Sequence, residues 1–131
     1  MSETNGRPME SLEHQGIDVL YSDERIVVVA KPSGLMVHRT NISTDRVFLS
    51  ELLLEQLGRK VWNVHRLDRA TSGVLLCALD AETAGLLGKQ FMAGTVEKRY
   101  LAVVRGWIDY EGIIDRPLRH ANRGDQDALT R

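Results

Sequence analysis

Runs of apolar residues, some alternating and some continuous, mark the first elements of the chain. Residues 17–21 alternate between apolar and polar side chains, which predicts a half-buried strand. Residues 25–30 are rich in β-branched side chains and end at a Lys-Pro-Ser-Gly turn over residues 31–34, so they predict a second strand. Two more apolar runs, residues 61–64 and 74–79, predict strands on either side of a polar segment.

Apolar residues at helical spacing indicate two helices between these strands. Residues 45–57 carry a wide apolar stripe, and Gly58 is the residue type that commonly ends a helix. Asp80 can cap a second helix over residues 81–93. Residues 96–104 alternate again and predict a last strand. The expected fold class is therefore α+β, with the order β-β-α-β-β-α-β, a mixed and mainly antiparallel sheet, and two helices.

Composition narrows the class of protein. The 131 residues suffice for one modest domain, with residues 1–16 expected as a disordered polar tail and residues 17–131 as the folded part. A net charge of −1 gives no overall basic field for nucleic acid, although basic residues can still gather on one face. No apolar stretch reaches the roughly 18–20 residues of a membrane span. The single cysteine, Cys77, lies in an apolar run, so we expect a buried thiol and a cytoplasmic protein.

The polar segment between the third and fourth strands concentrates reactive side chains. Residues 65–73 read His-Arg-Leu-Asp-Arg-Ala-Thr-Ser-Gly, with Asp68 between Arg66 and Arg69. A carboxylate between two guanidiniums stays ionised at neutral pH, which suits a nucleophile or a base. A surface loop with a local ion pair between Arg66 and Asp68 explains the same residues about as well. The residues alone leave both interpretations open.

A second segment with chemical potential covers residues 97–106. Tyr100 stands next to basic residues, and such a ring can stack on a base while the cations meet phosphate. Taken alone, it is more simply interpreted as a core tyrosine with its hydroxyl at the rim. The four histidines are scattered and, with one cysteine, give no metal-ligand spacing. Residues 31–34 are a rigid turn and not a phosphate-binding loop.

Together these segments resemble the pseudouridine synthases of the RluA family. Residues 65–73 look like the catalytic signature of that family, HRLDxxTSG, and residues 98–106 look like its tyrosine motif. Residues 19–24 and 29–38 are also similar to the family, so the resemblance covers roughly residues 17–131. Motifs around His38 and Tyr100 are similar to the tRNA pseudouridine synthase C subgroup.

The resemblance implies an RNA-modifying activity that needs no cofactor and no metal. The family breaks the N1–C1′ bond of uridine, turns the base, and joins C5 to C1′. Asp68 would be the catalytic carboxylate, as a nucleophile or as a base on the sugar. Arg66 would fill the gap left by the flipped uridine and pair with Asp68, and Tyr100 would stack on the target base. The other RNA-binding residues expected are Arg69, Lys98, His65 and Thr71.

The partner implied is structured RNA, with tRNA and its uridine 65 as the expected target. The family also has a second half, with a basic RTGRxHQIR-type motif that residues 17–131 do not contain. We therefore expect the amino-terminal portion of a catalytic domain, and the carboxy-terminal half could bind in trans. A chain of this extent should self-associate and be inactive alone. A non-catalytic RNA-binding remnant of the same fold is the alternative, and an unrelated α+β domain is a third interpretation.

Overall fold

The computed structural model of the chain describes residues 16–42, 44–45, 47–119 and 127–128. The predicted disordered tail therefore lies outside the described residues, apart from Gly16. The chain divides into two compact units, residues 1–98 and residues 99–131, which are considered separately below.

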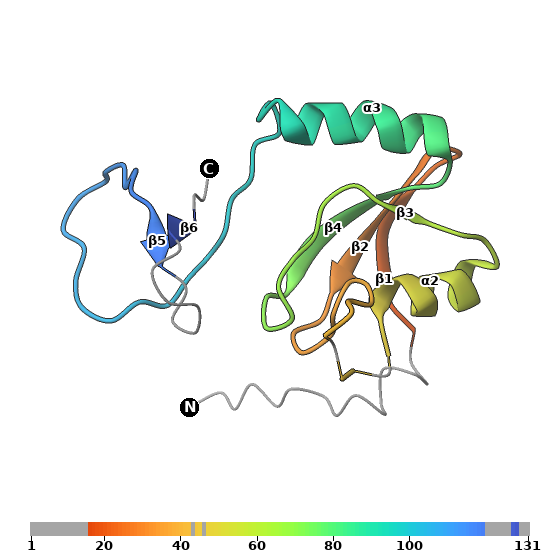
Figure 1. Cartoon of the computed structure of the whole chain (residues 1–131), viewed down its shortest axis with the longest axis horizontal. Helices are drawn as coiled ribbons and strands as arrows, with labels where there is room; N and C mark the ends of the chain where they lie inside the picture. The colour runs from red at the N-terminus through yellow and green to blue at the C-terminus, as the bar shows by residue number, and fades with distance from the viewer. Residues whose placement is uncertain (1–15, 43, 46, 120–126, 129–131) are drawn as a thin grey trace. The chain divides into compact units, whose positions relative to one another are not determined.

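A four-stranded antiparallel sheet forms the centre of the first unit (Figure 1). The strand order is β1-β2-β4-β3, and the strands are β1 Asp18–Ser22, β2 Ile26–Lys31, β3 Trp62–Asn63 and β4 Gly73–Ala78. The register pairs Val27 with Cys77 and Val29 with Leu75, so the inward positions of the two central strands face each other. The predicted α+β class, antiparallel pairing and two helices are confirmed.

The core lies on one face of β2 and β4. Val27, Val29, Leu75 and Cys77 are all fully buried, as expected for alternate positions of central strands. The apolar run of β4 thus places Cys77 inside as a small hydrophobe, and burial raises the pKa of its thiol to about 11. The prediction of a half-buried first strand is wrong, because every residue of β1 is exposed. β1 is an edge strand, and only Ile17 just before it reaches the core.

The first helix, α2 Leu49–Leu57, packs on this core through Leu49 and Leu53. It ends as predicted, because Gly58 has φ 67° and its N–H donates to Leu54 O. Its predicted start at residue 45 is wrong. Phe48 has extended backbone angles and forms a parallel bridge with Met36, so the buried aromatic ring is placed before the helix begins.

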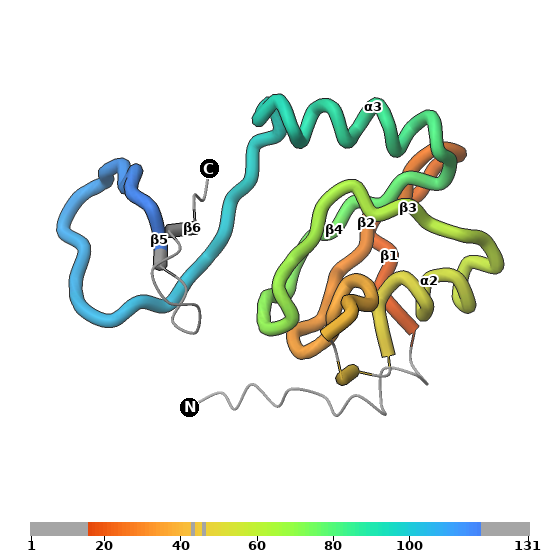
Figure 2. Tube along the Cα trace, in the orientation of Figure 1, coloured from red at the N-terminus to blue at the C-terminus, as the bar shows by residue number. Residues whose placement is uncertain are grey.

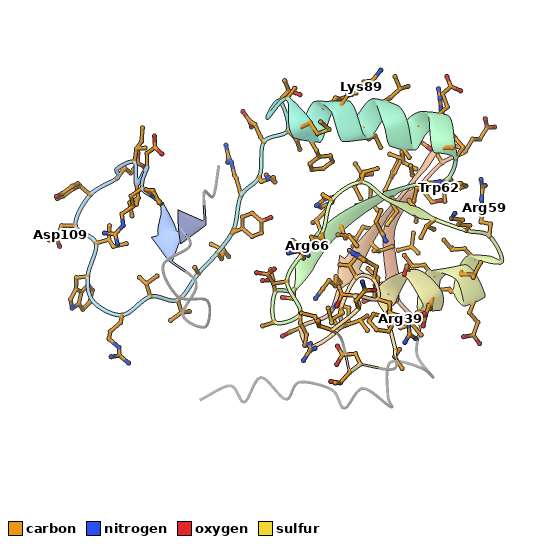
Figure 3. All side chains as sticks on the ribbon, viewed as in Figure 1. Arg39, Arg59, Trp62, Arg66, Lys89 and Asp109 are labelled. Carbon is orange, nitrogen blue, oxygen red and sulfur yellow. The ribbon has the colours of Figure 1, made fainter. Side chains whose placement is uncertain are left out.

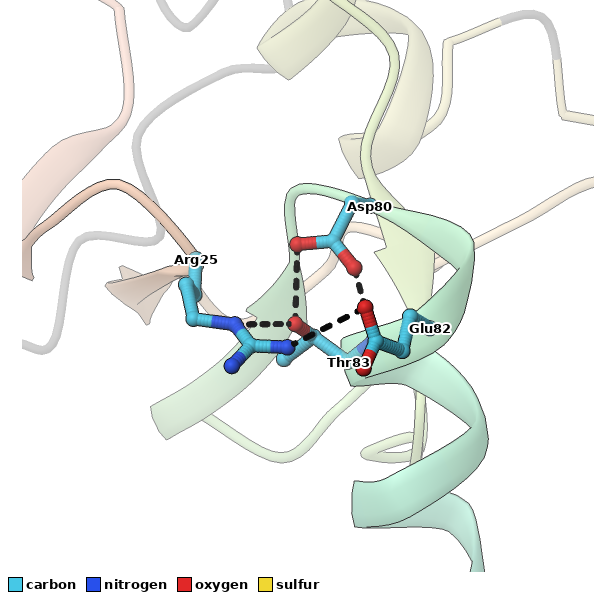
Figure 4. Close-up of polar contacts among 4 residues, drawn as sticks. All are labelled: Arg25, Asp80, Glu82 and Thr83. Atoms are coloured by element: carbon cyan, nitrogen blue, oxygen red, sulfur yellow. Dashed lines mark hydrogen bonds and ion pairs between the residues drawn. The ribbon is translucent and has the colours of Figure 1, made fainter.

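The second helix, α3 Ala81–Met92, begins at the predicted cap. The Asp80 carboxylate accepts a hydrogen bond of 2.7 Å from Thr83 N and one of 2.8 Å from the Thr83 hydroxyl. Arg25 joins this cluster from the turn before β2, because its Nε donates to the Thr83 hydroxyl at 2.9 Å and its guanidinium lies 3.7 Å from Glu82 (Figure 4). The cluster connects the start of α3 to the sheet.

The second unit contains a short antiparallel pair, β5 Leu118–Arg119 and β6 Asp127–Ala128. The strand predicted over residues 96–104 is not formed; this segment carries neither helix nor sheet pairing. A strand needs a neighbour for its backbone hydrogen bonds. Leu101 and Val103 are fully exposed, so the alternating pattern here has no surface on which to bury its apolar side.

Candidate active site

Two connections of the first unit meet at one end of the sheet. One leads from β2 towards α2, and the other leads from β3 to β4; Figure 2 shows them side by side. Gly34 N donates to Arg69 O at 2.7 Å, and the Ser33 hydroxyl donates to Ala70 O at 2.7 Å. The Pro-Ser-Gly turn therefore supports the polar loop over residues 65–72 through two hydrogen bonds to its backbone.

Lys31 is the residue that joins the two connections most firmly. Its side chain is 1% exposed, and Nζ donates to Pro32 O, Arg69 O and Thr71 O at 2.9, 3.0 and 2.6 Å. Burial lowers the pKa of Lys31, and the negative charge of Asp68 partly offsets that effect. Lys31 thus orders the backbone of the loop and places a positive charge near Asp68. Lys31 was not among the predicted site residues, although a lysine that ends an apolar strand is a signal for a buried, partnered ammonium.

The sequence suggested that Asp68 is paired with the guanidiniums on either side of it, but the structure shows a different arrangement. Arg69 binds Asp45 instead, with 2.8 Å between its guanidinium nitrogen and the carboxylate oxygen. The same guanidinium lies 3.4 Å from the Met36 sulfur. Arg66 is exposed and forms no ion pair with Asp68 within the described part of the chain (Figure 3). The local ion pair expected between Arg66 and Asp68 is therefore absent.

A small pocket opens beside Asp68. Its walls come from the polar loop and from the connection before α2, and its lining residues are Met36, Val37, His38, Thr40, Arg66, Leu67, Asp68 and Arg69. The cavity measures about 120 Å³. Pockets that enclose a small molecule usually measure about 300–1,000 Å³. The described residues thus form one side of a candidate ligand site, lined by a carboxylate, two arginines and two further polar side chains.

His65, at the start of the loop, is partly buried and held by two contacts. Its Nε2 accepts a hydrogen bond of 3.0 Å from Leu76 N, and its ring stacks on Phe91 with centroids 4.6 Å apart. Burial lowers the pKa of His65, and the positive charge of Lys98 adds to the effect. A nitrogen that accepts a hydrogen bond carries no proton, so these contacts fit the neutral imidazole. The geometry gives His65 a positioning role between β4 and α3.

The remaining predicted site residues fall in different places. Thr71 belongs to the loop, where its N–H donates to Asp68 O at 3.0 Å. Lys98 is the last residue of the first unit, whereas Tyr100 belongs to the second unit. Tyr100 is 60% exposed, so its interpretation as a core tyrosine is wrong. Stacking of Tyr100 on a base stays a prediction.

The described residues contain no group of three or more His, Cys, Asp or Glu side chains placed to hold a metal ion. Among the same residues, no helix is long and apolar enough to cross a bilayer.

Comparison with known proteins identifies the family. The sequence profile described as RNA pseudouridylate synthase matches residues 25–130. The chain belongs to this family. Its RluA-type signature thus lies on the loop that carries Asp68.

Curated relatives match over most of the chain. A tRNA pseudouridine synthase C from Haemophilus ducreyi is 45% identical over 104 residues, which are 79% of this chain and 43% of the relative. One from Pasteurella multocida is 46% identical over 104 residues, with the same coverage. The chain therefore spans about two fifths of the length of these relatives.

Among solved structures, Human RNA Pseudouridylate Synthase Domain Containing 4 matches 66% of this chain and 32% of its own, with a TM-score of 0.47 and 26% identity. Human RNA Pseudouridylate Synthase Domain Containing 1 matches 60% of this chain and 28% of its own, with a TM-score of 0.49 and 24% identity.

Proposed function

We propose that this chain provides the Asp68-bearing part of an enzyme that isomerises uridine to pseudouridine in structured RNA. The observation that carries the proposal is the placement of Asp68. Its carboxylate lines a pocket on a loop whose backbone is bound by the buried Lys31, within a segment that matches the pseudouridylate synthase family. A carboxylate on an ordered loop beside an open space suits nucleophilic or general-base chemistry.

The reaction exchanges one bond for another within the same nucleotide. The N1–C1′ bond of uridine breaks, the uracil ring turns, and a C5–C1′ bond forms while the C5 proton is released and N1 gains one. Asp68 acts either as the nucleophile at C1′ or as the base on the sugar, and both roles need its ionised form. The nucleotide must leave its helix to reach the pocket, at a cost of a few kcal/mol. Arg66 would offset that cost by filling the gap, and Tyr100 would stack on the base.

The RNA contacts divide by what holds each side chain. Arg66 is exposed and lacks an ion-pair partner within the described residues, so it is the loop cation available to phosphate. Arg69 approaches RNA with its charge partly neutralised by Asp45. Lys98 would add a second free cation, whereas His65 and Thr71 support the loop from within. The substrate we propose is tRNA, with uridine 65 as the position modified in the cytoplasm. Any carboxy-terminal half could act in trans.

The salt dependence of tRNA binding tests the proposal. Each lost phosphate contact removes about one unit from the slope of log affinity against log salt. Fluorescence anisotropy with labelled tRNA should therefore give a steep slope for the unmodified chain and a slope smaller by about 1 for Arg66→Gln. Lys89→Gln is the control, because Lys89 is an exposed cation of α3 outside the pocket (Figure 3). Affinity that does not change with salt would contradict an RNA-binding role.

A further inference from the structure

The wall of the pocket that faces the catalytic loop carries two polar side chains with unused hydrogen-bonding capacity. His38 and Thr40 line the same cavity as Asp68. Neither the His38 imidazole nor the Thr40 hydroxyl has a hydrogen-bond partner in the protein, as far as the described residues show. Arg69, which lines the same pocket, has its guanidinium bound by Asp45. The His38 and Thr40 side chains are therefore available to bind a ligand.

The backbone that leads into His38 is held by hydrogen bonds to the start of α2. Leu49 N donates to Met36 O at 2.8 Å, and Ser50 N donates to Val37 O at 3.0 Å. Val37 is 3% exposed and belongs to the core. The start of α2 therefore holds this wall, and polar groups on a fixed backbone lose little entropy when they bind.

The wall is also connected to the catalytic loop. Arg69 contacts the Met36 sulfur at 3.4 Å and the Asp45 carboxylate at 2.8 Å. One loop residue therefore binds the connection before α2 at two positions. This bridge connects the loop that carries Asp68 to the segment that carries His38 and Thr40. Because the pocket measures only about 120 Å³, a substrate group next to the atom at Asp68 lies close to His38 and Thr40.

The charges in the pocket favour a neutral ligand group over a phosphate. Asp45 pairs with Arg69, and the buried Lys31 interacts electrostatically with Asp68, so each carboxylate already has a cation nearby. The Asp68 carboxylate repels an anion placed next to it. The proposed reaction brings the ribose C1′ to Asp68, and the nearest polar group on that sugar is the 2′-hydroxyl. A hydroxyl both donates and accepts hydrogen bonds, which a threonine hydroxyl and an imidazole can satisfy.

We propose that His38 and Thr40 bind the ribose 2′-hydroxyl of the nucleotide held at Asp68, and thereby select RNA over DNA at that position. This inference rests on the proposed function and assigns it two further substrate-contacting residues. The 2′-hydroxyl is the group by which a protein distinguishes RNA from DNA at a given nucleotide. Removal of one hydrogen-bonding group that a protein site is built to bind typically weakens affinity by about 5- to 10-fold.

The test uses two labelled stem–loop RNAs that differ by one oxygen atom. Both carry a single uridine in the loop, and in the second RNA that nucleotide is 2′-deoxyuridine. Anisotropy at constant salt should give the unmodified chain about 5-fold weaker binding to the deoxy probe. His38→Ala and Thr40→Val should each weaken binding to the ribose probe alone, so that the ratio of the two affinities falls towards one. Thr95→Val makes the same change at an exposed position shortly after α3 and should keep the full ratio.

Each result decides between the inference and the function on which it rests. Equal affinity of the unmodified chain for both probes would overturn the inference and leave RNA binding intact. Binding to neither probe would overturn the proposed function and the inference together. A full ratio in both His38→Ala and Thr40→Val would also overturn the inference. Thr40→Val preserves side-chain shape, and the unfolding midpoint of each variant shows that the fold is retained.

Discussion

Lys31 illustrates how a single buried charge can organise a functional loop. An ammonium at 1% exposure is unfavourable unless its three donors are satisfied, and here three backbone carbonyls satisfy them. Two of these carbonyls, Arg69 O and Thr71 O, belong to the loop that carries Asp68. The cost of burying Lys31 is thus linked to the conformation of that loop.

Replacement of Lys31 by methionine tests this link. Lys31→Met keeps a long, unbranched side chain but leaves the three carbonyls without their donor. We therefore expect the free energy of unfolding to fall by about 1–3 kcal/mol. The Thr71 amide, which donates to Asp68 O, should exchange with solvent faster. Urea denaturation and hydrogen exchange measure the two effects. Lys89→Met at the exposed end of α3 is the matched control and should change stability by less than about 0.5 kcal/mol.

His65 gives the fold a dependence on pH. Its folded-state pKa lies below its ordinary value of 6.5, so the unfolded chain binds the proton first as the pH falls. The stability contributed by neutral His65 is complete above pH 6.5 and is lost as the pH falls from 6.5 to the folded-state value. We expect His65→Gln to lose less stability than the unmodified chain between about pH 7 and pH 5. Parallel stability curves for the two proteins would contradict this assignment.

At the scale of elements, local signals located the helices and the central strands but not every boundary. Gly58 and Asp80 act through their own backbone and side-chain geometry, so their positions in the sequence were sufficient. The start of α2 was misplaced because Phe48 pairs with Met36, a contact that helical spacing cannot reveal. The alternation at residues 96–104 indicated a strand, but a strand also depends on a neighbouring edge.

The cap of α3 is an element whose contribution can be removed alone. Asp80→Ala deletes the acceptor for Thr83 N and leaves that amide without a partner at the helix start. We expect a lower unfolding midpoint and faster exchange of the first-turn amides of α3. Asp18→Ala on the exposed edge strand provides the control. The hydrogen bonds from Thr83 lower the pKa of Asp80 below its ordinary value of 3.8, so the cap should persist until the pH falls below that value.

At the scale of the whole molecule, the candidate site was only partly visible in the sequence. The signature loop singled out Asp68, which lines the pocket, and its catalytic role stays a prediction. The pairing of Arg69 with Asp45 and the three bonds of Lys31 join residues far apart in the chain, so local spacing gave no sign of them. His38 and Thr40 became candidates only when the fold placed them beside Asp68.

The second unit exposes more apolar surface than a soluble monomer usually tolerates. The most exposed large hydrophobic side chains in it are those of Leu101, Val103, Trp107 and Ile113, each at 95% or more. We expect the chain to self-associate, with a mass in light scattering that rises with concentration. Substitution of Leu101 and Val103 by threonine should reduce the association, because threonine exposes less apolar surface than leucine or valine. A monomer at every concentration would contradict this expectation.

The role proposed here for Asp68, on the loop bound by Lys31, is to perform the isomerisation. The direct measurement is the pseudouridine content of tRNA after incubation with a hybrid enzyme. In this hybrid, the matched 104 residues of the Haemophilus ducreyi relative are replaced by those of the present chain. We predict pseudouridine formation by the hybrid, and none by the hybrid with Asp68→Asn, at equal tRNA affinity and equal unfolding midpoint. Undiminished pseudouridine formation by the Asp68→Asn hybrid would show that Asp68 is not the catalytic group.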